Sequence, residues 1–335
     1  MGEPLVSVVI ITYNHVNYIS HAIEGVLNQK TSFPFELVIG EDCSTDGTRD
    51  IIYSIKNRHP DLIRVITSDR NVGMVNNFIR TSNACLGKYI AFCEGDDYWH
   101  RQDKLQLQFD YLEANQDCGL ICSDYDVRDI KSNKTIINFI AYKKWKLPTN
   151  FRISDWVSDK TEVPILTVTV MVRRDLCEKV IKCDPYLYEN GSFLMYDWPL
   201  WAEMSELAKV GYIQDSLATY NVSENSVTRP KDIEKDLKFT ISIYKAAIYL
   251  CEKYKLSEQI KLYRKRLLCS ATLNLAWRTQ DGKLADEVMT KNNIKLSWKD
   301  WYKYYAAKYS AVYYSYIVIS LIKKILIGEG NKWYE

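Results

Sequence analysis

Short apolar runs alternate with helix-like stretches along the first 125 residues, and this alternation limits most strongly how the chain can fold. The apolar runs are Leu5–Ile11, Phe35–Gly40, Ile63–Thr67, Lys88–Cys93 and Gly119–Ser123. The helical patterns between them are Tyr18–Asn28, Thr48–Asn57, Val75–Cys85 and Arg101–Ala114. Strands that alternate with helices of this length form βαβ units. The sequence therefore predicts an α/β fold with a mostly parallel, Rossmann-like sheet flanked by helices.

The pattern changes twice farther along the chain. After Tyr125 it weakens, and there we expect a hairpin over Asp126–Ile140. The later elements that we predict are a strand at Ile165–Val172, a helix at Tyr196–Ala208, short strands at Gly211–Gln214 and Leu217–Asn221, and helices at Lys231–Tyr254, Ser257–Thr279 and Ala285–Asn292. Because composition shifts near Thr228–Pro230, we place a domain boundary there, with residues 1–228 in one domain and a helical C-terminal region over 229–335.

Charge and cysteine content exclude several classes of protein. The 44 basic and 42 acidic residues give a net charge of +2, which makes no electrostatic case for a nucleic-acid partner. The nine cysteines are scattered without a C-x-x-C pair, so we expect free thiols in a reducing compartment. The N-terminal apolar run is too short for a signal peptide, and we therefore predict a cytoplasmic protein.

An acidic turn over residues 94–99 follows the strand predicted at Lys88–Cys93. Its adjacent carboxylates, Asp96 and Asp97, repel each other unless they share a cation. Carboxylate oxygens are preferred by Mg²⁺ and Mn²⁺, which also bind substrate diphosphates. The sequence thus favours a metal site here, although a solvated acidic turn would look the same.

Polar residues also follow the first three predicted strands. They are Thr12, Tyr13 and Asn14 after the first strand, Asp42 after the second, and Asn71 and Gly73 after the third. In parallel α/β sheets ligands bind beyond the carboxyl ends of the strands. Tyr13 could stack on a nucleobase or be an ordinary surface tyrosine, Asp42 could accept a hydrogen bond from a base or ribose, and Gly73 suits a left-handed turn.

Taken together, these segments resemble the nucleotide-sugar domain of family 2 glycosyltransferases, which have the GT-A fold. The resemblance is carried by Pro4–Asn14, Glu41–Thr48 and Gly87–Asp97. It implies that residues 1–125 bind the nucleotide sugar and that residues 126–228 supply the acceptor side and the base. By the same resemblance Tyr13 and Asp42 hold the base, Asp96 lies near the ribose and diphosphate, and Asp97 ligates Mn²⁺ or Mg²⁺. The chain departs from the usual Asp-x-Asp-Asp pattern by having Glu94 in the first acidic position.

The segment Met195–Trp201 is similar to the element of this family in which an acidic residue before a helix acts as catalytic base. Asp197 is the corresponding residue, and the apolar rings of Trp198 and Trp201 would raise its pKa. Asp197 could instead be only a helix N-cap, and Glu189 and Asp184 are weaker candidates for the base. Family members invert the anomeric centre, a displacement that requires a base and charge neutralisation on the leaving diphosphate.

The resemblance implies a nucleotide-diphosphate donor, most commonly a UDP-sugar, and a glycan or lipid-linked acceptor in bacterial surface polysaccharide assembly. Motifs of nucleotidyltransferases, dinucleotide-dependent dehydrogenases and P-loop enzymes are missing from the sequence. The remaining rival is a non-catalytic nucleotide-sugar-binding or membrane-docking module. The run Tyr309–Ile322 is uncharged, too short to span a bilayer, and flanked by lysines. It could lie in the headgroup region at the inner face of the membrane, or pack in the protein or a homo-oligomer interface.

Overall fold

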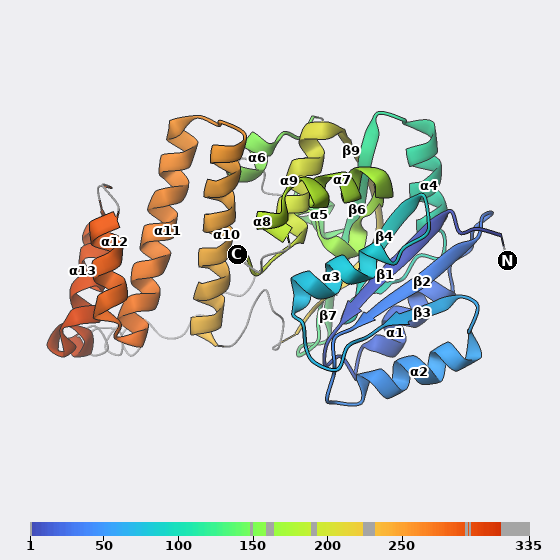
Figure 1. Cartoon of the computed structure of the whole chain (residues 1–335), viewed down its shortest axis with the longest axis horizontal. Coiled ribbons are helices and arrows are strands. Elements are labelled where there is room, and N and C mark those ends of the chain that lie inside the picture. The colour runs from blue at the N-terminus through green and yellow to red at the C-terminus, as the bar shows by residue number, and fades with distance from the viewer. Residues whose placement is uncertain are drawn as a thin grey trace. The chain divides into compact units, whose positions relative to one another are not determined.

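The computed structural model describes residues 2–147, 150–158, 164–188, 193–223, 232–291, 294 and 296–315. The chain forms two compact units, Met1–Ser226 and Val227–Glu335, which Figure 1 shows in colours running from blue to red. The domain boundary predicted near residue 228 lies outside the described residues.

The first unit is built on one mixed sheet. Its strands are β1 (Val6–Thr12), β2 (Phe35–Glu41), β3 (Ile63–Ile66), β4 (Tyr89–Glu94), β5 (Tyr98–Trp99), β6 (Cys118–Asp129), β7 (Lys134–Ile136), β8 (Met171–Arg173) and β9 (Lys209–Val222). They lie in the order β3-β2-β1-β4-β8-β6-β9-β5, and β7 pairs with β6. The strands β3, β2, β1 and β4 run parallel, as predicted, whereas β8 pairs antiparallel with both β4 and β6.

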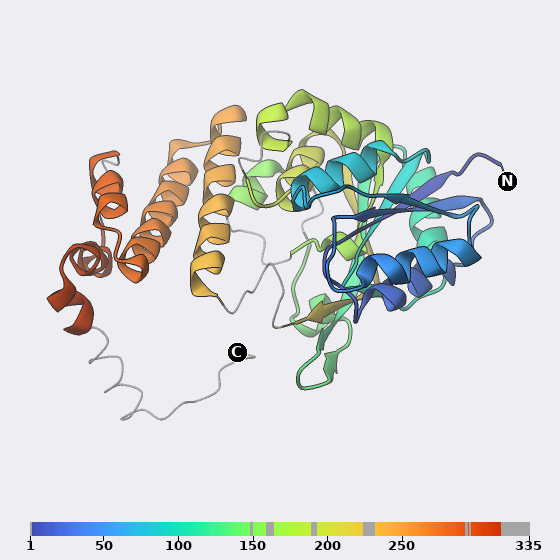
Figure 2. The same cartoon turned by 60° about the horizontal axis from the view of Figure 1, so that its bottom comes forward.

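Helices cover both faces of this sheet. They are α1 (Ile19–Leu27), α2 (Thr48–Arg58), α3 (Met74–Asn83), α4 (Lys104–Ala114), α5 (Phe139–Tyr142), α6 (Ile153–Val157), α7 (Arg174–Cys183), α8 (Pro185–Tyr188) and α9 (Asp197–Leu207). Alternate residues of a strand point to opposite faces. Val6, Val8 and Ile10 of β1 belong to the same buried cluster as the apolar residues of α1, α2 and α4. On the opposite face Phe92 of β4 contacts Phe78 of α3 and Trp201 of α9. Figure 2 shows α3 on one side of the sheet and α1 and α2 on the other.

Three predicted strands differ from the structure. The strand expected over Ile165–Val172 is a 3₁₀ turn, η1 (Thr167–Thr169), followed by the short β8. Side chains from other elements bind the η1 carbonyls that a strand would offer to its neighbour: Trp99 Nε1 donates to Val168 O and Gln108 Nε2 donates to Thr169 O. The two short strands predicted between Gly211 and Asn221 are one strand, β9. Irregularities in its pairing with β6 absorb the polar residues between them.

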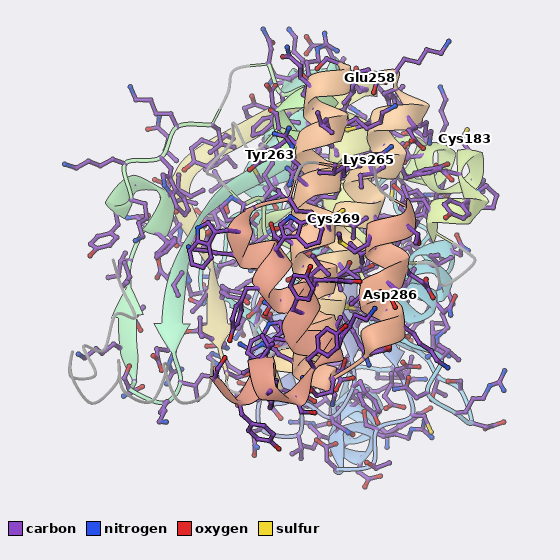
Figure 3. The ribbon with its side chains drawn as sticks, turned by 90° about the vertical axis from the view of Figure 1, so that its left-hand side faces the viewer. Cys183, Glu258, Tyr263, Lys265, Cys269 and Asp286 are labelled. Carbon is purple, nitrogen blue, oxygen red and sulfur yellow. The ribbon has the colours of Figure 1, made fainter. Side chains whose placement is uncertain are left out.

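Among its described residues the second unit has the helices α10 (Ile233–Lys253), α11 (Glu258–Thr279), α12 (Gly282–Lys291) and α13 (Trp298–Lys308). Figure 3 looks onto α11, which carries Tyr263, Lys265 and Cys269. Helices α11, α12 and α13 share a core that includes Leu273, Ala285 and Ala306. No helix within the described residues is both long enough and apolar enough to cross a membrane.

Candidate active site

The ends of three neighbouring strands bring the predicted site residues to one edge of the sheet. Thr12 at the end of β1 pairs with Glu41 at the end of β2, and Ile11 pairs with Glu94 at the end of β4. The loops that follow these strands therefore start side by side. This arrangement is what parallel pairing dictates, because parallel strands all end at the same edge of the sheet.

The acidic turn after β4 is held tightly against the loop after β1. The amide of Gly95 donates to Ile11 O at 3.0 Å. A Cβ atom on Gly95 would lie 2.6 Å from Thr12 Oγ1 and 2.7 Å from His15 Nδ1, so only glycine fits without displacement. Thr12 is thus buried against the turn, with its hydroxyl 3.2 Å from His15 Nδ1.

Asp96 and Asp97 have different surroundings. The Asp97 side chain is only 1% exposed; its Oδ1 accepts a hydrogen bond of 2.8 Å from Asn221 N, and its Oδ2 has no partner. Asp96 is partly exposed, and its backbone carbonyl accepts a bond of 2.6 Å from Asn221 Nδ2. Asn221 of β9 therefore adds two hydrogen bonds to those that hold the acidic turn, and Asp96 is the carboxylate of this pair with access to solvent.

Four carboxyl groups, those of Glu94, Asp96, Asp97 and Asp197, lie at this edge. Burial, together with the negative charges of Asp96 and Asp197, holds the pKa of Glu94 well above its usual range. Burial and the charges of Asp96 and Glu94 likewise raise the pKa of Asp97 well above its usual range. Asp197 lies close to the acidic turn, because the hydroxyl of Tyr196, the residue before it, donates to Glu94 Oε1 at 3.4 Å.

Asp197 is the first residue of α9, and Tyr196 occupies the cap position without a side-chain capping bond. Burial raises the pKa of Asp197, the direction expected of its apolar surroundings. Its Oδ2 accepts a hydrogen bond of 3.2 Å from Thr167 Oγ1. Of the two other candidates for the base, Asp184 is buried and caps α8 through the amide of Leu187, and Glu189 lies outside the described residues.

The loop after β1 presents one large exposed side chain. Tyr13 is 44% exposed. Asn14 has a positive φ of 56°; its amide donates to Ser44 Oγ, and its Oδ1 accepts from Thr45 N at 2.9 Å. Asn14 therefore ties the β1 loop to the β2 loop, and Tyr13 projects from the β1 loop as an exposed aromatic residue.

Asp42 binds the loop after β3. Its carboxylate accepts hydrogen bonds from Val72 N at 2.8 Å and Gly73 N at 3.0 Å. Gly73 has a φ of 87°, as its predicted turn requires, and Asn71 Oδ1 accepts a further bond of 2.9 Å from the Gly73 amide. Asp42 is only 2% exposed, so it organises this loop and has little surface left for a ligand.

Comparison with known proteins identifies the family. The model of "Glycosyl transferase family 2" matches residues 7–181, more than half of the 335-residue chain. The chain belongs to glycosyl transferase family 2. The predicted family and enzyme class are thereby confirmed at the level of the family.

Relatives of this family 2 chain match it over limited lengths. A Mycobacterium bovis protein described as uncharacterized is 43% identical over 109 residues, which are 32% of this chain and 32% of that protein. An uncharacterized glycosyltransferase of Nostoc is 28% identical over 223 residues, covering 65% of this chain and 64% of the relative. The chain thus spans about a third to two thirds of the length of these curated relatives.

Solved structures of the same architecture cover nearly the whole chain. Residues 1–349 of TarS from S. aureus, in complex with UDP, match with a TM-score of 0.51 at 16% identity, over 93% of this chain and 91% of that one. A mannosyltransferase from Pyrobaculum calidifontis, in complex with GDP-Man and Mn²⁺, matches with a TM-score of 0.54 at 15% identity, over 98% and 88%. At these identities the likeness concerns the fold alone, and it confirms the GT-A architecture.

The donor set of this family 2 site suits a hard divalent cation. Within the described residues no three His, Cys, Asp or Glu side chains converge on one point. Such a cluster is not required, because Mg²⁺ is commonly bound by one or two carboxylates together with substrate phosphates. Two buried oxygens of the acidic turn and its partner residue, Asp97 Oδ2 and Asn221 Oδ1, have no hydrogen-bond partner. Two oxygen atoms at the acidic turn are therefore without a hydrogen bond and could bind a cation, which fits the predicted metal.

Three residues of the site were not predicted from the sequence. Asn221 holds the acidic turn, Tyr196 hydrogen-bonds Glu94 at 3.4 Å, and Thr167 hydrogen-bonds Asp197. Tyr196 directly precedes the predicted base, and this adjacency was the one available signal. Thr167 and Asn221 reach the site through tertiary packing that no local pattern indicates.

Proposed function

We propose that this chain is an inverting glycosyltransferase that moves a sugar from a nucleotide-diphosphate donor to an acceptor hydroxyl in cell-surface polysaccharide synthesis. The observation that supports this function best is the convergence of two kinds of carboxylate at one sheet edge. A partly exposed acidic turn carries Asp96, and a separate carboxylate with a raised pKa, Asp197, begins α9. Inverting transfer needs these two parts: a site for the charged leaving group and a base for the acceptor.

In this proposal Asp197 accepts the proton of the acceptor hydroxyl as that oxygen attacks the anomeric carbon and the bond to the diphosphate breaks. The raised pKa of Asp197 brings it closer to the operating pH, where a general base is most effective. Asp96 and Asp97 are the proposed ligands of Mn²⁺ or Mg²⁺, and Asp96 is the ligand that a cation reaches directly because it is partly exposed. When bound, the metal would neutralise charge on the departing diphosphate.

Tyr13 is the proposed stacking platform for the donor base because it is the exposed aromatic residue of the β1 loop. Asp42, Asn71 and Gly73 would shape the loop that faces the same base. A UDP-sugar is the proposed donor, since TarS, which shares the fold, was solved with UDP. A GDP-sugar is the alternative, because the archaeal mannosyltransferase was solved with GDP-Man.

A glycan or lipid-linked glycan is the proposed acceptor. TuaG of Bacillus subtilis, named as a candidate glycosyltransferase of teichuronic acid biosynthesis, is 34% identical over 126 residues, 37% of this chain and 48% of that protein.

One face of the second unit supports peripheral membrane contact: Trp298, Trp301, Tyr305 and Tyr309 are 42–75% exposed along α13 and its end. Trp301 stacks on Tyr305, and Tyr305 on Tyr309. Such amphipathic rings suit a headgroup region, although they also suit a homo-oligomer interface. The part of the predicted run beyond Ser315 lies outside the described residues.

The function is tested by incubating the protein with a panel of UDP- and GDP-sugars and Mn²⁺ and measuring the free nucleoside diphosphate. We expect release from at least one donor, loss of release in EDTA, and a fall of about 10²-fold or more for Asp197→Asn. Donor binding without release by any member of the panel would favour the rival function, a non-catalytic binding module. Full activity in EDTA would contradict the metal assignment.

Membrane contact is tested separately, by sedimentation with liposomes that contain anionic lipid. Replacing both Trp301 and Tyr305 by serine should abolish co-sedimentation while donor hydrolysis is retained. Absence of wild-type co-sedimentation would contradict membrane contact, and light scattering would then test whether the aromatic face forms an oligomer interface.

A further inference from the structure

We propose that Tyr196 and Thr167 form a hydroxyl bridge that positions the catalytic base Asp197 relative to Glu94 of the acidic turn. This inference rests on the proposed glycosyltransferase function and deepens it by naming the residues that hold its base. Neither residue is proposed to touch the substrate, so both are positioning residues.

Tyr196 links the start of α9 to the end of β4. Its hydroxyl donates to Glu94 Oε1 at 3.4 Å, and its side chain is only 1% exposed. The ring stacks on Phe78 of α3, with centroids 3.9 Å apart and planes inclined by 16°. Because Tyr196 immediately precedes Asp197, a ring fixed in this way also fixes the backbone from which the Asp197 carboxylate extends.

Thr167 holds the Asp197 carboxylate itself. Its hydroxyl donates to Asp197 Oδ2 at 3.2 Å and also interacts with the Tyr196 hydroxyl. The Thr167 residue is only 3% exposed. The Thr167 hydroxyl therefore has a fixed position if the turn η1 that carries it is rigid.

The turn η1 is rigid because two buried side chains bind its carbonyls. Trp99 Nε1 donates to Val168 O at 3.0 Å, and Gln108 Nε2 donates to Thr169 O at 2.7 Å. Gln108 is in turn held by Lys104 Nζ at 2.6 Å. The position of the Thr167 hydroxyl is thus set by β5 and α4, which belong to the scaffold of the sheet.

The bridge fixes the relative position of two carboxyl groups of the site. Glu94 ends β4 and Asp197 begins α9, so the relative position of the two carboxyl groups depends on the side chains that contact them. The Tyr196 and Thr167 hydroxyls give each carboxylate a fixed hydrogen bond and thereby keep the base near the reacting atoms. A displacement of a catalytic group by about 1 Å can cost on the order of 10²-fold in rate.

The test compares Thr167→Val with Thr169→Val. Both replace a buried threonine of η1 by a residue of the same shape, but the Thr169 hydroxyl donates to Leu166 O, within the turn, at 2.7 Å. For Thr167→Val we expect kcat to fall about 10-fold or more, with an unchanged KM for the donor and unchanged binding of the nucleoside diphosphate. Thr167→Ser, which keeps the hydroxyl, should restore kcat to within a few-fold of wild type, and Thr169→Val should retain it.

A double-mutant cycle with Tyr196→Phe completes the test. If the two hydroxyls act as one bridge, the double variant should lose little more kcat than the more affected single variant. Wild-type kcat in Thr167→Val, an equal loss in Thr169→Val, or independent additive losses in the cycle would each overturn the bridge. The proposed function fails in a distinguishable way: Asp197→Asn would then be as active as wild type, or wild type would show no transfer.

Discussion

Lys104 is a lysine buried in the interior of the first unit. It is the first residue of α4 and is 0% exposed. Its ammonium group donates to Gln108 Oε1 and lies 4.3 Å from the centroid of the Trp99 ring. Burial lowers the pKa of Lys104 from 10.5 to about 7. We expect Lys104→Met, which keeps the length of the side chain and removes its charge, to stabilise the protein at mildly acid pH.

The magnitude follows from linkage. Between pH 7 and 10.5 the unfolded chain binds the Lys104 proton and the folded chain does not, so the wild type gains stability as pH rises through this window. One pKa unit corresponds to about 1.4 kcal/mol, which puts the cost of the buried charge below pH 7 at no more than about 5 kcal/mol. The Met variant avoids this cost but leaves Gln108 Oε1 without its donor, at about 1–3 kcal/mol. A net gain of roughly 2–4 kcal/mol should remain at pH 6, and about 3 kcal/mol of it should vanish by pH 9.

The assay is urea unfolding of both proteins from pH 6 to pH 9, followed by pulse-labelling of the buried thiols Cys93 and Cys122 at one fixed pH. Both thiols belong to the first unit, so their labelling reports its unfolding. Lys88→Met is the control: Glu113 raises the pKa of Lys88, so the stability difference from wild type should stay flat up to pH 9. A pH-independent difference for Lys104→Met would contradict a lowered pKa of Lys104, because it would mean that this residue titrates alike in the folded and unfolded states.

Three further outcomes are expected. Gly95→Ala should lower the free energy of unfolding by about 1–3 kcal/mol, because its Cβ would lie 2.6 Å from Thr12 Oγ1; an unchanged melting temperature would contradict this close approach. Because burial raises the pKa of Asp197, kcat/KM should still be rising with pH above the ordinary range of an aspartate, and a pH–rate profile that is already level there would argue against Asp197 as the base. Tyr13→Ala should weaken binding of the nucleoside diphosphate in titration calorimetry much more than Tyr13→Phe, whereas equal affinities would exclude stacking.

The fold of residues 5–125 could be predicted because each central strand is buried on both faces. Every residue of β1 is buried, which makes Val6–Ile11 a nearly continuous apolar run in the sequence. The apolar pattern of Ile165–Val172 predicts a strand for the same reason. It forms η1 instead, because Trp99 and Gln108, more than 60 residues earlier, bind its carbonyls. Tertiary hydrogen bonds of this kind do not alter the local hydrophobic pattern of the sequence.

In the candidate site, too, the sequence predicts some residues, whereas contacts between distant segments could not be predicted. Asp96 and Asp97 could be found because they come shortly after an apolar run, and Asp197 because it stands at the start of a helix. Their different exposure could not be predicted, since Asn221 buries Asp97 from 124 positions away in sequence. The contact of Asp42 with the Val72 and Gly73 amides could not be predicted from the sequence either, because it depends on how the loops after two neighbouring strands pack together.

The cysteines have a practical consequence for anyone who wants to observe donor binding. All nine are unpaired, but seven are buried; Cys43 is half-buried and Cys183, labelled in Figure 3, is exposed. A gentle thiol reagent should therefore modify two positions and spare the rest. Cys43 directly follows Asp42 in the loop after β2, and its own φ of 60° shows how sharply that loop turns. In a Cys183→Ser background a fluorophore on Cys43 would stand beside the proposed nucleobase loops, so the native chain already carries an attachment point for an optical sensor of nucleotide occupancy.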